Sequence, residues 1–209
     1  MPSFKVDLSD SANDFLRVVW PALRSPMGGG EVVPVEGSVD SVLANKFDTN
    51  SGIDYWHFSL NGQMRGLATR VQWCDRSWGT FTVRYSRDSG ARTEYHKRLE
   101  AIYSSEGWLY PYFTIQAYVA NPRRQGALIS ACAIKTKDLM DICADIERAE
   151  LAKKHSPAGG MRRTNNAVFL YVYWNWLESN GVATLRSPQP APPAQMLKPC
   201  KPVQLTLTV

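Results

Sequence analysis

The sequence lacks several features that would place it in a common class of protein. Its apolar runs fall well short of the roughly 20 residues that a membrane-spanning helix needs, so no membrane partner is expected. Residues 1–14, MPSFKVDLSDSAND, contain no basic start followed by an apolar stretch. Because a secretory signal has that pattern, the cytoplasm is the expected compartment.

Cysteine and histidine are also scarce. The four cysteines form no Cys-x-x-Cys pair, and the three histidines have no short ligand spacing, which argues against a structural zinc site. The glycine run at 28–33, GGGEVV, lacks the Lys-Ser/Thr ending of a phosphate-binding loop. Without an export signal we expect reduced thiols, with Cys132 and Cys143 in the core.

Length and charge allow one sizeable domain with a polyanionic partner. The chain has 209 residues, which we divide into a single globular domain, 1–186, and a proline-rich tail, 187–209. The tail is expected to be extended or disordered, and it is a candidate contact for a protein partner. The 24 Lys and Arg residues exceed the 19 Asp and Glu residues, and a net charge of +5 is compatible with a nucleic-acid partner.

Periodicity predicts an α/β or α+β domain with a central mixed sheet and flanking helices. Two β-rich runs around Asn61-Gly62 predict a hairpin, and the glycine- and proline-containing stretch 25–37 predicts a loop. The aromatic run 165–181 fits either a strand or a helix. The other expected helices are 9–25, 38–48, 89–107 and 136–155, and the expected strands are 53–60, 63–73, 79–87, 112–120 and 127–135.

Asp54 opens the first strand of the hairpin, on its more apolar face. Side chains alternate along a strand, so Asp54 shares a face with Trp56 and Phe58. Burial of an ionised carboxylate there is costly without a partner. We therefore expect Asp54 either to lie in water at the rim of the sheet or to meet a cation, which can be a metal or an arginine.

The turn of the hairpin decides whether Asp54 meets the polar residues of the second strand. A two-residue turn at Asn61-Gly62 pairs Asp54 with Thr69 and places Arg70 and Gln72 on the opposite face. A three-residue loop with a left-handed Gly62 pairs Asp54 with Ala68 instead, and Asp54, Arg70 and Gln72 then converge. Both registers remain open at this point.

The stretch from Ser51 to Asp54, SGID, followed by RVQ at 70–72, resembles the PD-(D/E)XK nuclease-like family, whose members have a restriction-endonuclease-like core. The resemblance covers roughly residues 35–146. It implies that Asp54 and a helical acid, Asp40, hold magnesium, with Glu36 or Asp48 as alternatives to Asp40. It further implies a magnesium-dependent endo- or exonuclease that hydrolyses nucleic-acid phosphodiesters, DNA being expected, in a phage, mobile-element or defence setting.

The sequence departs from that family at the third motif. Arg70 stands where the family has a carboxylate, and arginine has no lone pair for magnesium. Gln72 stands where the family usually has lysine, although glutamine can still orient water. Two interpretations follow: either the site is rearranged, with Asp54, Arg70 and Gln72 as the catalytic set and Glu94 as a further candidate, or the metal is lost and Arg70 neutralises Asp54.

Arginines outside the hairpin supply candidate contacts to a phosphate backbone, because arginine forks match phosphate oxygens. The nucleic-acid-binding candidates are Arg84, Arg87, Arg92, Arg123 and Arg124. The leading expectation is thus metal-dependent hydrolysis. The alternative is a non-catalytic module on the same fold that binds nucleic acid or protein. A third possibility is an inhibitor or assembly factor that binds a protein partner.

Overall fold

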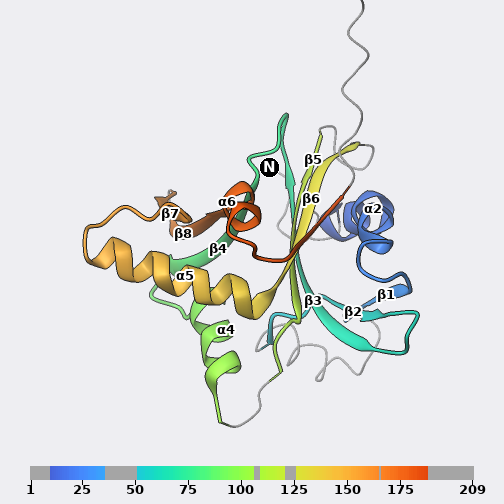
Figure 1. The fold of residues 1–209 in the computed structure, drawn as a ribbon, viewed down its shortest axis with the longest axis horizontal. Coiled ribbons are helices and arrows are strands. Elements are labelled where there is room, and N and C mark those ends of the chain that lie inside the picture. Colours follow the sequence, from blue (N-terminus) through green and yellow to red (C-terminus); the bar gives the residue numbers. More distant parts are fainter. Residues whose placement is uncertain (1–9, 36–50, 106–108, 121–125, 165, 188–209) are drawn as a thin grey trace, which may run out of the picture.

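The computed structural model describes residues 10–35, 51–105, 109–120, 126–164 and 166–187 (Figure 1). These residues form two β-sheets and a small number of helices, which confirms the α+β class. The expected helix at 38–48 and the proline-rich tail from 188 onward lie outside the described residues. None of the described helices is both long and apolar enough to cross a membrane.

The larger sheet has six strands in the order β1-β2-β3-β5-β6-β9. Its central pair, β3 and β5, is parallel, whereas the other neighbours are antiparallel. Parallel strands need a crossover connection, and the chain between β3 and β5 supplies it with β4 and α4. The strands are β1 (Glu31–Pro34), β2 (Tyr55–Phe58), β3 (Met64–Trp73), β5 (Phe113–Val119), β6 (Leu128–Lys135) and β9 (Thr184–Arg186).

The smaller sheet was not expected, because the periodicity of the sequence predicted one central mixed sheet. It is antiparallel and has the order β4-β8-β7, with β4 at Thr80–Arg87, β8 at Ala167–Tyr173 and β7 at Gly159–Arg163. The strand predicted at 79–87 therefore exists, but it belongs to the small sheet, where Thr80 pairs with Tyr173 and Arg87 with Ala167.

The helices lie on both sides of the large sheet (Figure 1). The first helical segment contains a π-helical stretch immediately before Pro21, where the Trp20 N–H bonds to the Phe15 carbonyl. Because proline has no N–H to donate, the widened turn lets the helix continue past Pro21 to Arg24. The helical elements are η1 (Phe15–Val19), α2 (Trp20–Arg24), α4 (Glu94–Tyr103), α5 (Thr136–Leu151) and α6 (Trp174–Ser179).

Further stretches of the chain differ from the expectations or were left open by them. The stretch 25–37, expected as a loop, contains β1, which pairs with β2. The ambiguous run 165–181 is both strand and helix, because β8 ends at Tyr173 and α6 begins at Trp174. The strands β7 and β9 were not predicted; β7 begins with two glycines and β9 has three residues, so neither carries a strong β signal.

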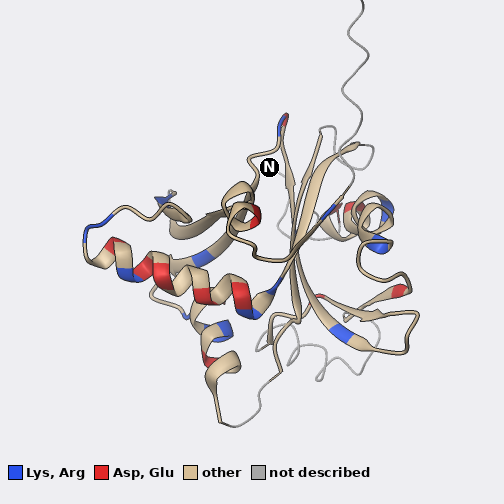
Figure 2. Cartoon of the chain, viewed as in Figure 1, with Lys and Arg blue, Asp and Glu red and all other residues tan. Residues whose placement is uncertain are grey.

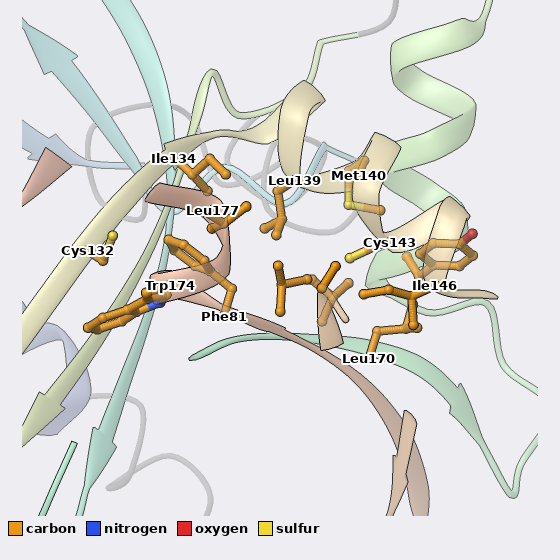
Figure 3. Packing of buried hydrophobic residues seen from close by; sticks show 14 of the residues in the cluster. Phe81, Cys132, Ile134, Leu139, Met140, Cys143, Ile146, Leu170, Trp174 and Leu177 are labelled. Carbon is orange, nitrogen blue, oxygen red and sulfur yellow. The ribbon is translucent and has the colours of Figure 1, made fainter. Parts of the chain in front are cut away.

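Two hydrophobic cores flank the large sheet. One lies between this sheet, the small sheet, α5 and α6, and includes Phe81, Cys143, Leu170 and Trp174 (Figure 3). The other lies under η1 and α2 and includes Phe15, Leu23 and Ile115. The prediction that Cys132 and Cys143 are core residues is confirmed, since both thiols are fully buried and free.

The glycine run before β1 lets the chain turn sharply from α2 into the sheet. Gly30 has a φ of +91°, and a Cβ atom there would lie 1.9 Å from the Phe58 carbonyl oxygen. We expect Gly30→Ala to destabilise the protein by at least about 2 kcal/mol, because a left-handed alanine alone costs about 1–2 kcal/mol and the β1–β2 backbones must also separate. Urea denaturation measures this change.

Gly62→Ala is the matched control for that prediction. Gly62 has a φ of +78°, but nothing lies within 4 Å of a Cβ atom built there. Its substitution should cost only the conformational part, about 1 kcal/mol. Equal losses of stability for the two variants would show that the close approach to Phe58 contributes nothing.

Candidate functional site

The hairpin adopts the three-residue loop. Tyr55 pairs with Leu67 and Phe58 with Met64, the Ser59 N–H donates to the Gln63 carbonyl at 2.9 Å, and Gly62 is left-handed. Of the two registers considered above, this is the one that brings Asp54 and Arg70 to the same side of the hairpin. The structure confirms that convergence, since both residues line one cleft.

This cleft, which we call the basic cleft, lies where β3 and β5 meet β4 and the start of α4, and its volume is about 510 Å³. Gln72 is not among its described lining residues and is exposed further along β3. Its place is taken by Gln116, the parallel neighbour of Arg70 on β5. The cleft is lined by Ser51, Gly52, Asp54, Ala68, Thr69, Arg70, Thr82, Arg84, Arg87, Arg92, Thr93, Glu94, Lys97, Arg98, Thr114, Ile115 and Gln116.

Basic side chains outnumber acidic ones in the described lining of the cleft. Six cationic residues, from Arg70 to Arg98, face two carboxylates, Asp54 and Glu94. The three nearby arginines that the sequence suggested for nucleic-acid binding, Arg84, Arg87 and Arg92, all belong to this set. The other two, at positions 123 and 124, lie outside the described residues. The cleft therefore has a positive excess suited to an anion.

Glu94 is the electrostatic centre of the cleft. Its carboxylate lies 2.6 Å from Arg98 Nη1 and 3.6 Å from Arg70 Nη2, and it accepts a bond from the Arg84 backbone N–H at 3.4 Å. Burial opposes ionisation of Glu94, but Arg98, Arg70 and the Arg84 N–H together hold the pKa of its carboxyl below the usual range. Glu94 is thus an ionised anchor for two arginines. Arg98 follows it at i,i+4 spacing on α4, whereas no spacing along the chain indicated the contact with Arg70.

Arg70 joins the two sheets across the floor of the cleft. Its Nη1 donates to Thr82 Oγ1 on β4 at 3.0 Å, and that hydroxyl donates to Gln116 Oε1 at 3.0 Å. Burial lowers the pKa of Arg84, and the positive charges of Arg70 and Arg87 lower it further. The cationic groups in the cleft therefore repel one another, and a bound anion would relieve that repulsion.

Two buried donors that line the cleft are left without an acceptor by the described part of the chain. Arg98 and Gln116 are 5% and 1% exposed, and neither Arg98 Nε nor Gln116 Nε2 has an acceptor among the residues that the structure describes. A buried donor without a partner costs about 1–3 kcal/mol. Gln116 could have been suspected from the sequence, because it is a polar residue in the middle of the apolar strand TIQAYV; Arg98 gave no such signal.

The described residues do not fit a magnesium site. Asp54 Oδ2 accepts bonds from the Thr69 N–H at 2.5 Å and the Thr69 hydroxyl at 3.1 Å, Arg70 cannot act as a ligand, and Glu94 is committed to arginines. No group of three or more His, Cys, Asp or Glu side chains in the described ranges could hold a metal ion. Asp40, the expected second ligand, lies outside those ranges.

The chain is therefore an α+β protein whose basic cleft is lined by residues of both sheets. No family model, curated protein or solved structure matches this chain. The resemblance to PD-(D/E)XK nucleases therefore stays a prediction from its motif pattern, and the chemistry of the cleft has to be inferred from its own residues.

Proposed function

We propose that this protein binds nucleic acid, DNA being the expected form, by seating a backbone phosphate in the basic cleft. The observation that carries the proposal is the surplus of cations in the described lining of one cleft. Six basic residues stand there against two carboxylates, and one of the six, Arg92, is paired with a carboxylate outside that lining, that of Glu100. Phosphate oxygens accept the paired N–H groups of arginine, and a cleft focuses the field of its charges on the ligand.

The arrangement of the arginines supports phosphate binding rather than a purely structural cluster. Arg98 is held by Glu94 and is nearly buried, whereas Arg70 is 30% exposed and Arg87 lies at the surface. A fixed inner cation with partly exposed outer cations allows a phosphate to contact both. The donors of Arg98 and Gln116 that have no acceptor among the described residues lie at the base of the same cleft.

The charge of α5 indicates which side of the protein a polyanion would avoid. Acidic residues recur along this helix (Figure 2). A DNA backbone would be repelled there and attracted to the cleft, so the distribution of charge favours one direction of approach. These acidic residues are Asp138, Asp141, Asp145, Glu147 and Glu150.

We expect the double variant Arg84→Gln/Arg87→Gln to bind a fluorescent DNA oligonucleotide at least about 10-fold more weakly than the wild type. Each lost phosphate contact should also reduce the slope of log affinity against log salt by about one. Fluorescence anisotropy at several salt concentrations measures both quantities. The matched control is Lys137→Gln/Arg148→Gln, which removes the same charge from α5, where both residues sit in exposed ion pairs.

The outcomes separate binding from hydrolysis. Equal loss in the two double variants, or no binding by the wild type at low salt, would contradict the proposal. A chelator should leave binding unchanged, because the described cleft offers no magnesium ligand set. Cleavage of the oligonucleotide that needs magnesium and stops with chelator would instead support the nuclease expected from the sequence.

A further inference from the structure

Three aromatic residues form a row on the central strand of the small sheet. Phe169, Tyr171 and Tyr173 alternate along β8 with Leu170 and Val172, which are fully buried in the core. Because side chains alternate across a strand, the three rings stand on the face of the sheet opposite that core. We call them the β8 aromatic row.

The row is open to solvent at its far end. Tyr173 is 43% exposed, and its ring lies 5.4 Å from that of Tyr171 in an edge-to-face arrangement. Tyr171 pairs with Gly160 on β7, where a Cβ atom would come within 2.7 Å of the Tyr171 hydroxyl. The absence of a side chain at Gly160 therefore leaves the space that the Tyr171 hydroxyl occupies. Glu150 Oε1 lies 3.2 Å from the same Cβ position, so a carboxylate borders the row at Tyr171, and the backbone of a bound strand is expected on the side of the row that carries the arginines.

The near end of the row runs into the basic cleft. The guanidinium carbons of Arg70 and Arg84 each lie 5.4 Å from the centre of the Phe169 ring. Both arginines line the cleft, and Arg84 is the cross-strand neighbour of Phe169 on β4. On the other side, Phe169 pairs with Arg162 of β7, which is exposed. Cations thus flank the aromatic row at the end where the cleft holds its positive charge.

We propose that the β8 aromatic row stacks the bases of a single-stranded nucleic acid whose backbone phosphate occupies the basic cleft. The inference rests on the proposed function and names its ligand class. Rings on the face of a sheet, bordered by arginines, are the combination that binds unpaired bases with little dependence on sequence. In a duplex the base faces are already stacked on one another, so the row should favour single strands.

The test compares Tyr173→Ala with Tyr173→Phe, using a single-stranded oligonucleotide and inorganic polyphosphate as probes. Loss of one stacked base should weaken oligonucleotide binding about 5- to 150-fold in Tyr173→Ala and leave polyphosphate binding unchanged. Tyr173→Phe keeps the ring and should bind like the wild type. Tyr103→Ala is the control, because Tyr103 is 60% exposed and contacts Asp141 and Lys137 of α5.

Each outcome bears on one of the two proposals. If both probes bind the wild type and Tyr173→Ala affects neither, or both equally, the stacking row is overturned while the phosphate cleft stands. A blunt duplex that competes for the protein as well as its single strands do would also overturn the stacking row alone. If neither probe binds the wild type, the proposed function itself is wrong.

Discussion

Replacement of Glu94 with glutamine is expected to destabilise the protein and to increase its affinity for DNA. The free energy of unfolding should fall by about 3 kcal/mol, the lower end of the range for breaking a buried ion pair. The reason is that the Arg98 side chain, only 6% exposed, would lose the carboxylate that neutralises it. The lower end applies because the Glu94 side chain is 25% exposed, so water can replace part of the interaction.

The gain in DNA affinity follows from the same charge. Glu94 neutralises part of the positive field of Arg70 and Arg98, and its removal leaves the cleft more cationic. A structural role alone would predict lower stability with unchanged or weaker binding. Urea denaturation and anisotropy titration of the same preparation distinguish the two. Asp145→Asn is the control, because its ion pair with Arg148 on α5 is exposed, lies outside the described lining of the cleft and should contribute less than about 1 kcal/mol.

The stability difference should also depend on pH. The pKa of Glu94 is held below its ordinary value of 4.5, so the stabilisation is fully present above that value and is lost as the pH falls through the folded-state pKa. At pH 7 the wild type should therefore be clearly more stable than Glu94→Gln, and the gap should narrow as the pH falls below 4.5. A gap that stays constant down to pH 3 would contradict the ion-pair explanation.

Trp174→Ala is expected to give the largest loss of stability, about 3–5 kcal/mol, the range for truncating a buried large aromatic side chain. Trp174 is 2% exposed and lies beside Phe81 in the core (Figure 3). The centre of its ring is 5.7 Å from that of Phe81 and 5.5 Å from that of Tyr118. Phe81 belongs to the small sheet and Tyr118 to the large one, so the cavity would open where the two sheets are joined.

Because the basic cleft takes residues from both sheets, Trp174→Ala should weaken DNA binding as well. The measurement is urea denaturation, followed by anisotropy at a temperature where the variant stays folded. Trp78→Ala serves as the control, since Trp78 is 48% exposed and its substitution should change stability by no more than about 0.5 kcal/mol. A folded Trp174→Ala protein with wild-type affinity would show that the cleft does not depend on this contact between the sheets.

The parts of the fold that were predictable from the sequence are those with a local signal. The hairpin has an Asn-Gly turn between two β-rich runs, and α5 has a clear amphipathic period. β1 was missed because its partner β2 lies beyond residues 36–50, and its three preceding glycines indicate a loop when taken alone. The second sheet was missed because β4 gives no local sign that it pairs with β8.

The same limit applies to the site. The convergence of Asp54 and Arg70 depended on whether the hairpin loop has two or three residues. The sequence was compatible with both loops, and the structure has the three-residue loop. Gln72 was predicted as a site residue because it alternates with Arg70 along β3. The glutamine that lines the cleft is Gln116, which the parallel pairing of β3 with β5 places next to Arg70. Arg98 and Glu94 meet Arg70 only through the crossover, which no spacing along the chain reveals.

The crossover between β3 and β5 has a consequence for how the protein is made. The chain leaves the large sheet after Trp73, at the end of β3, and forms β4 of the small sheet, whose partner β8 begins only at Ala167. A chain emerging from the ribosome thus carries the arginines of β4 and α4 long before the strand that fixes β4 exists. Pairing between such distant segments is slow to form. Anion recognition should accordingly be among the last properties that the newborn polypeptide acquires.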